Sequence, residues 1–166
     1  MKNTIKVITE LKKKGLIKDY AIGGAIAVLR WVEPFFTRDL DIFVIPAQKT
    51  KDKQLISFSP IYDYLKTKGY NEWVGQWIMI EGVPVEFIPA EGLAGESVKN
   101  SIATDFEGVK TRVITPEYLI ALLLLAGRQK DKIKVEMLLK QTKIDFRKLK
   151  EILKKYDLKV KLRPFL

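Results

Sequence analysis

The sequence predicts an α/β fold in which helices pack on a small mixed β-sheet and a C-terminal helical extension follows. Three observations predict it. Apolar and polar residues alternate over residues 37–44 and 83–88, which is the pattern of half-buried strands. Apolar residues recur at helical spacing over residues 4–14, with lysines on the outer side. The 166 residues, 47% of them hydrophobic, are enough for one domain with a substantial core.

Residues 1–114 are expected to form the core of this domain. Gly15 ends the first helix, because glycine readily adopts the left-handed conformation of a helix C-cap. Proline after Glu33 ends the second helix, and Ser59 caps the third, which has proline in its first turn. The expected elements are helices over residues 4–14, 25–32 and 59–68, strands over residues 20–22, 37–46, 70–76, 77–81 and 83–88, two short strands within residues 102–114, and irregular loops over residues 49–54 and 90–100.

Residues 115–166 are expected to form the helical extension. Thr115 caps a helix that runs to about Gly127. A second helix is expected over residues 130–141, and a third, capped by Asp145, runs to residue 156. The apolar segment 118–126 is too short to cross a bilayer. The chain begins with a lysine-rich helix and not with an apolar signal segment, so we expect a cytoplasmic protein without a membrane partner.

The composition excludes several kinds of site. The sequence contains no cysteine and no histidine, so disulfides, thiolate nucleophiles, Cys/His zinc sites and Ser-His-Asp triads are ruled out. Acid–base chemistry must then use carboxylates, lysine or tyrosine, and a metal site must use oxygen ligands. The net charge of +10 favours a polyanionic partner, usually nucleic acid, although a solvated lysine-rich surface would give the same charge.

Two aspartates lie close together in the strand expected over residues 37–46. Alternation puts Thr37, Asp39, Asp41 and Phe43 on one face and leaves the apolar Leu40, Ile42 and Val44 on the other. Asp39 and Asp41 are then roughly 6.6 Å apart along the strand. Because like charges on one face resist burial, a divalent cation such as Mg²⁺ is the economical neutralising partner. The alternative is that both aspartates end an edge strand and face water.

Two further features accompany the aspartates. Gly23-Gly24 lies between a strand and a helix, where glycine lets the backbone approach a phosphate and the first helical amides point at an anion. A plain tight turn would have the same sequence. Glu86 is a charge between apolar neighbours in the middle of strand 83–88, where a glutamate on a solvated sheet face is the other interpretation.

These residues together resemble the nucleotidyltransferase superfamily. The resemblance rests on Gly23-Gly24 followed, at this spacing, by the hexapeptide TRDLDI of residues 37–42, and it extends to the minimal nucleotidyltransferases that include the AbiEii-type toxins. It spans most of residues 18–156 and includes the turn RQKD over residues 128–131. Two positions depart from the pattern of this branch. The branch usually has a lysine in the preceding helix, where this chain has the leucines 122–125, and it commonly has an acid three residues beyond the turn, where this chain has Lys134.

The resemblance implies a nucleotidyltransferase-like sheet and a metal-dependent enzyme that moves a nucleoside monophosphate from an NTP to an acceptor hydroxyl. The implied catalytic residues and ligands of Mg²⁺ or Mn²⁺ are Asp39, Asp41 and Glu86, and the implied nucleotide contacts are Gly23, Gly24, Thr37, Arg128 and Lys130. The implied partners are an NTP, an RNA acceptor such as the 3′ end of a tRNA, and an antitoxin protein.

A second hypothesis belongs to a different class of protein. The missing helical lysine and the change to Lys134 fit a degenerate domain that binds nucleotide or nucleic acid without catalysis. An enzyme needs divalent ions for NTP binding, whereas a binding module of this kind would lose affinity steeply with salt and ignore chelators. A third hypothesis is a scaffold or antitoxin-bound subunit whose partner completes the site.

Overall fold

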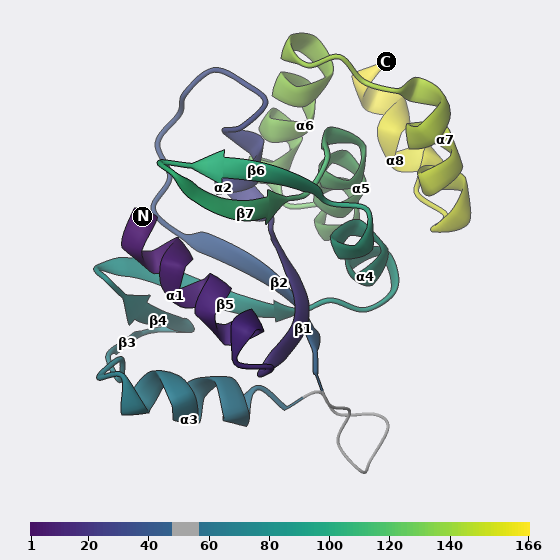
Figure 1. The fold of residues 1–166 in the computed structure, drawn as a ribbon. Coiled ribbons are helices and arrows are strands. Elements are labelled where there is room, and N and C mark those ends of the chain that lie inside the picture. Colours follow the sequence, from purple (N-terminus) through teal and green to yellow (C-terminus); the bar gives the residue numbers. More distant parts are fainter. Residues whose placement is uncertain (48–56) are drawn as a thin grey trace.

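The computed structural model describes residues 1–47 and 57–166, and the loop predicted over residues 49–54 lies outside them. The strands are β1 (Ile17–Ile22), β2 (Leu40–Pro46), β3 (Trp73–Val74), β4 (Trp77–Ile80), β5 (Val83–Pro89), β6 (Ile102–Phe106) and β7 (Val109–Val113). They form a 7-stranded sheet in the order β3-β4-β5-β2-β1-β7-β6 (Figure 1). β2 pairs in parallel with β5 and β1 with β7, and the other neighbours are antiparallel, so the predicted mixed sheet is confirmed.

Helices cover this sheet and continue beyond it. They are α1 (Lys2–Lys13), α2 (Gly24–Val28), α3 (Ser59–Thr67), α4 (Gly92–Lys99), α5 (Pro116–Ala126), α6 (Gln129–Gln141), α7 (Phe146–Lys155) and α8 (Lys159–Leu162), with a 3-10 turn over Arg163–Phe165. α1 packs against β1 and β7, whereas α2 and α4 pack against β2. α5 contacts α2 and α4 on one side and α6 and α7 on the other, so it joins the core to the C-terminal helices (Figure 1). A domain division at residue 114 stays a prediction.

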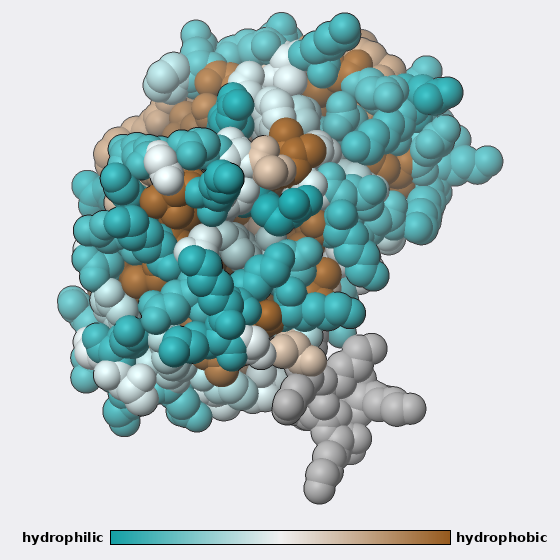
Figure 2. Space-filling view, in the orientation of Figure 1, coloured by the Kyte–Doolittle hydropathy of each residue, from teal (hydrophilic) through white to brown (hydrophobic). Residues whose placement is uncertain are grey.

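The surface of the molecule is mostly hydrophilic on the face that Figure 2 shows. Among residues 1–47 and 57–166, no helix combines the length and the apolar character needed to span a membrane.

The predicted alternation in the two central strands is confirmed. Leu40, Ile42 and Val44 of β2 are fully buried, whereas Asp41 is only half-buried. The sequence predicted that this strand begins at residue 37, but it begins at Leu40. Leu40 pairs with Val85, so the next position of the register would set Asp39 beside Pro84, which has no backbone N–H for the ladder.

The segment predicted as an irregular loop, residues 90–100, contains the helix α4 instead. Its two glycines have low helix propensity, but Leu93 and Val98 are buried where α4 packs against β1, β2 and α5. A side chain at Gly95 would come within 2.9 Å of the Ala90 carbonyl oxygen, so a glycine is needed for this close approach. Burial of apolar side chains therefore outweighs the local preference.

The predicted helix ends are mostly correct. Gly15 and Gly127 both have positive φ, at 72° and 64°, after α1 and α5. The Asp145 carboxylate accepts the Lys148 amide at 3.0 Å and caps α7. Thr115 lies at the N-cap of α5, although its hydroxyl makes no hydrogen bond there. The cap of α3 was predicted one residue late, because Phe58 holds that position and Ser59 is already helical.

Glu96 of α4 ties together the helices that follow it. Its carboxylate accepts the hydroxyls of Tyr118 in α5 at 2.9 Å and of Tyr156, just after α7, at 2.6 Å, and it pairs with Lys155. Because hydrogen bonds to a charged group are strong, we expect Glu96→Ala to lower the free energy of unfolding by about 2–3 kcal/mol. Thermal unfolding should show this as a loss of roughly 5–10 °C in Tm. Glu151→Ala, which removes an exposed glutamate from α7, is the control and should change Tm little.

Candidate active site

Asp41 and Glu86 are directly adjacent across the parallel β2–β5 pair. The same face continues to both sides. Ile78 pairs with Val85 in the antiparallel β4–β5 hairpin, so the next position sets Trp77 opposite Glu86. On the other side, the Gly23 amide donates to the Asp41 carbonyl at 3.0 Å. The strand pairing therefore lines up Trp77, Glu86, Asp41 and Gly23 in one row across the sheet.

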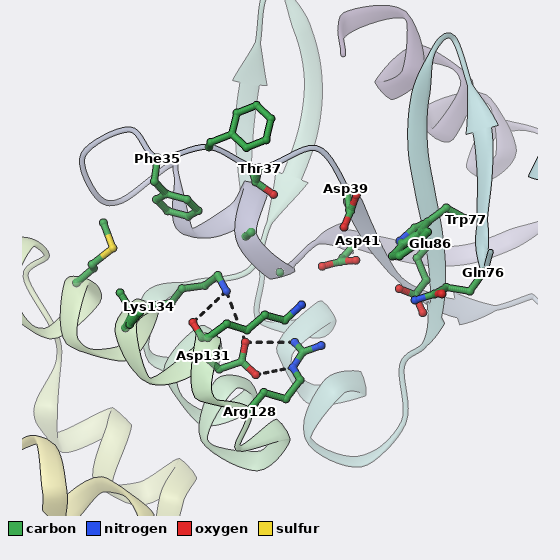
Figure 3. A pocket seen from close by; sticks show the side chains of 16 residues that line it. Phe35, Thr37, Asp39, Asp41, Gln76, Trp77, Glu86, Arg128, Asp131 and Lys134 are labelled. Atoms are coloured by element: carbon green, nitrogen blue, oxygen red, sulfur yellow. Dashed lines mark hydrogen bonds and ion pairs between the residues drawn. The ribbon is translucent and has the colours of Figure 1, made fainter. Parts of the chain in front are cut away.

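A cavity of ≈ 420 Å³ opens over this row. The structure brings seven of the eight predicted site residues to its wall, which are Gly24, Thr37, Asp39, Asp41, Glu86, Arg128 and Lys130. Gly23 does not line the cavity and lies at the end of β1 beside it. Figure 3 shows Asp39, Asp41 and Glu86 on one side of the space and Arg128 and Lys134 on the other. Acidic and basic side chains thus face each other across a single pocket.

Asp41 is the carboxylate most perturbed by its surroundings. Burial, followed by repulsion from Glu86 and Asp39, raises its pKa to about 6, while the nearby cations Arg128 and Lys130 act in the opposite direction. Loss of hydration and neighbouring negative charges both disfavour the ionised form. The carboxylate is therefore held in a place where its charge is not neutralised by the protein alone.

The basic wall is organised by Asp131, which is 1% exposed. Arg128 forms two hydrogen bonds with its carboxylate, from Nε at 2.7 Å and from Nη2 at 3.2 Å, and the Lys134 amine lies 3.6 Å away. This pairing raises the pKa of Arg128 and fixes its guanidinium at the start of α6. Lys134 also lines the pocket, so it adds a cation to this wall.

The two glycines leave room for the side chains of β2. A side chain on Gly24, whose φ is +57°, would overlap the Asp41 carboxylate and come within 2.7 Å of its Cγ. A side chain on Gly23 would overlap the ring of Phe43. The helix that follows is only five residues long, whereas the sequence predicted one to residue 32. Close packing against β2 therefore explains both glycines, and the approach of a phosphate stays a prediction.

Several wall residues had no role in the sequence prediction; they include Phe35, Phe36, Gln76, Trp77, Ile133 and Met137. Trp77 could have been found, because a two-residue turn at Glu81-Gly82 fixes the hairpin register and so sets residue 77 opposite Glu86. Its indole N–H is buried and has no partner among the described residues. Phe36 lies in an irregular segment before β2, where no periodic pattern predicts which way a side chain points.

Solved structures with the same arrangement of elements decide the fold. A crystal structure of an antigenic nucleotidyltransferase-like protein from Paracoccidioides brasiliensis matches 97% of this chain and 90% of its own, with a TM-score of 0.57 and 16% identity. The antibiotic-resistance factor ANT(2'')-Ia matches 93% of this chain and 89% of its own, with a TM-score of 0.53 and 13% identity. The fold is nucleotidyltransferase-like. No protein-family model and no curated protein sequence matches the chain.

A nucleotidyltransferase-like fold raises the question of whether these residues fit divalent metal ions. No three acidic side chains in residues 1–47 and 57–166 are arranged to hold one ion together. Mg²⁺ commonly binds one or two carboxylates and takes its other ligands from water and substrate phosphates. Asp39 and Asp41 offer such a pair at the pocket wall. Burial, followed by repulsion from Glu86 and Asp39, raises the pKa of Asp41, and a cation would stabilise its ionised form. The donor set fits Mg²⁺ or Mn²⁺ shared with a triphosphate.

Proposed function

We propose that this protein is a metal-dependent nucleotidyltransferase, which moves a nucleoside monophosphate from an NTP to an acceptor hydroxyl. The observation that carries the proposal is the opposition of acids and cations across one pocket of a nucleotidyltransferase-like fold. The acids are Asp39, Asp41 and Glu86, and the cations are Arg128, Lys130 and Lys134. The acidic side can hold metal ions, and the basic side can hold phosphates.

In the proposed reaction the acceptor oxygen forms a bond to the α-phosphorus of the NTP, the bond from that phosphorus to pyrophosphate breaks, and the hydroxyl proton is lost to a carboxylate or to water. Asp39 and Asp41 would hold the divalent ions, which supply positive charge to the phosphates and make the acceptor hydroxyl more acidic. Glu86, one strand away from Asp41, would orient the acceptor. Arg128 and Lys130 would neutralise charge on the departing pyrophosphate.

The acceptor that we propose is an RNA 3′ end, such as that of a tRNA, and the net charge of +10 supports it. A toxin of the AbiEii-type branch, acting in the cytoplasm and held by an antitoxin protein, is the biological role that the sequence resemblance favours. Size-exclusion chromatography of the protein alone and with the product of a neighbouring gene tests that role. A stable complex supports it.

The direct test is calorimetric titration of each NTP, with and without Mg²⁺, on the wild type and on Asp39→Ala/Asp41→Ala. We expect Mg²⁺-dependent binding that weakens in the variant on the order of 100-fold, because each lost ligand contact to a charged group is worth about 1.5 kcal/mol. The matched control is Asp63→Ala/Glu72→Ala, which removes two exposed acids far from β2 in sequence and should bind like the wild type. Full binding by the Asp39→Ala/Asp41→Ala variant would contradict the assignment.

A catalytically degenerate binding module is the second candidate, and Lys134 favours it because the AbiEii-type pattern has an acid there. The same titration separates the two proposals. Binding of NTP that is unchanged by chelator, falls steeply with salt and survives the loss of both aspartates would support the binding module.

A further inference from the structure

The basic charge of this protein is concentrated at its C-terminal end. Residues 128–166 contain 14 lysines and arginines against 5 acids, a net charge of +9. The preceding residues 1–127 contain 16 basic and 15 acidic residues, a net charge of +1. A lysine-rich surface that serves only solubility would spread its charge over the whole molecule. Here nearly all of the excess lies on α6, α7, α8 and the short segments between them.

Most of these basic side chains lie outside the pocket and are accessible to a binding partner. Arg147, Lys150 and Lys154 recur at i, i+3 and i+7, so they share the outer face of α7, and the beginning and end of α8 add Lys159, Lys161 and Arg163. All six are exposed, and none forms an ion pair with another described residue. We call these six residues the α7–α8 basic surface. Asp145, Glu151 and Asp157 are the exposed acids beside them.

The α7–α8 basic surface is one continuous part of the fold. α8 packs against α7, and α7 packs against α5 (Figure 1). The two other basic residues of α7 contact the rest of the protein: Lys155 pairs with Glu96, and Lys148 lies over the ring of Tyr118. The six that remain therefore point away from the core. In Figure 2 the corresponding part of the molecule, at the upper right, is covered mainly by hydrophilic residues.

We infer that the α7–α8 basic surface binds the phosphate backbone of an RNA strand. The pocket already has Arg128, Lys130 and Lys134 for a single nucleotide, so six further cations on α7 and α8 call for an anion longer than an NTP. A nucleic-acid strand offers a regular series of charges along its length. α6 supplies the basic wall of the pocket, and α5 packs against both α6 and α7, so the pocket and the α7–α8 basic surface belong to helices that share α5 as a neighbour.

The experiment measures binding of a fluorescein-labelled single-stranded RNA of about 20 nucleotides by fluorescence anisotropy, without NTP and with chelator. The variant Arg147→Gln/Lys150→Gln/Lys154→Gln is compared with the wild type as the salt rises. Each lost phosphate contact lowers the salt slope by about 0.7 for a single strand, so we expect a slope smaller by about 2. Between 50 and 200 mM salt, the wild type should then lose roughly 20-fold more affinity than the variant.

The matched control removes the same charge elsewhere, with Lys2→Gln/Lys13→Gln/Lys66→Gln on exposed positions of α1 and α3. It should keep the wild-type affinity and slope. Equal losses in both triple variants would mean that only total charge matters, and no RNA binding by the wild type would overturn the inference outright. Capture by phosphatidylserine vesicles through the same residues, without RNA binding, would assign the surface to a membrane instead. Because neither NTP nor metal is present, the result is independent of the proposed transfer reaction.

Discussion

Replacing Asp41 with asparagine is expected to make the folded protein more stable at neutral pH, although the same change should weaken metal-dependent NTP binding. Asp41 is held among other acids in a half-buried site, which raises its pKa from 3.8 to about 6. An ionised carboxylate there destabilises the fold, and the amide of asparagine carries no charge. We expect a gain of about 1–2 kcal/mol after allowance for solvent screening. This corresponds to a rise of roughly 3–6 °C in Tm at pH 7.

The pH dependence of this effect has a definite sign. Because the pKa of Asp41 is higher in the folded state than in the unfolded chain, the folded state binds the proton more tightly. The contribution of Asp41 to stability is therefore fully present below about pH 4 and is lost as the pH rises to about 6. The stability advantage of Asp41→Asn should be near zero at pH 4 and reach its maximum by pH 7.

Thermal unfolding followed by circular dichroism between pH 4 and 8, in the presence of chelator, checks this prediction. Asp63→Asn, at an exposed position of α3, is the control and should show no such trend. Addition of Mg²⁺ at pH 7 should stabilise the wild type and leave Asp41→Asn unchanged. A variant that is no more stable at pH 7 than the wild type would show that burial and the neighbouring carboxylates do not destabilise the ionised form of Asp41 in solution.

Two acids of the candidate site, Asp41 and Glu86, could be predicted because they lie on regular strands. The alternation of residues 40–44 and of 83–88 gave the faces of β2 and β5 from the sequence alone, and pairing of those strands brought Asp41 beside Glu86. The basic half came only from the family resemblance. Nothing in the periodicity of α6 shows that Asp131 is buried or that it holds Arg128 in place. That arrangement depends on how α6 packs against α5.

The predictions that were wrong concern segments decided by long-range contacts. The sequence predicted a helix to residue 32, but α2 ends at Val28, and the Trp31 amide then bonds to the Val28 carbonyl in a tighter turn. Trp31 also donates its indole N–H to the Ile114 carbonyl at 3.3 Å and accepts the Thr142 hydroxyl at 2.9 Å. These partners are more than 80 residues away in the chain. Local propensity contains no information about them, and the same is true of α4.

Gly24→Ala is expected to disturb both the candidate site and the stability of the fold. The new methyl group would overlap the Asp41 carboxylate and push it out of the row formed with Glu86. The left-handed backbone at this position adds about 1–2 kcal/mol of strain for any residue with a Cβ. We therefore expect Mg²⁺-dependent NTP binding to weaken by about 10-fold, as for loss of one ligand contact worth about 1.5 kcal/mol, together with a clear fall in Tm.

Gly15→Ala provides the matched control. Gly15 also has a left-handed backbone, with φ of 72°, but a side chain there would meet nothing within 4 Å. Both substitutions carry the backbone strain, and only the one at Gly24 displaces Asp41. If the two variants lose the same stability and both keep Mg²⁺-dependent NTP binding, close packing of Gly24 against Asp41 is not what places the carboxylate.

A double-mutant cycle then isolates the contact itself. In the Asp41→Ala background the carboxylate that Gly24→Ala would displace is absent, so the second substitution should add only the backbone strain and a milder contact with the Cβ of residue 41 at 3.0 Å. We expect its effect on the free energy of unfolding to be smaller there than in the wild type by about 1–3 kcal/mol. Strict additivity would mean that Gly24 and Asp41 act separately, and the glycine would then be explained by its backbone conformation or by an approaching phosphate.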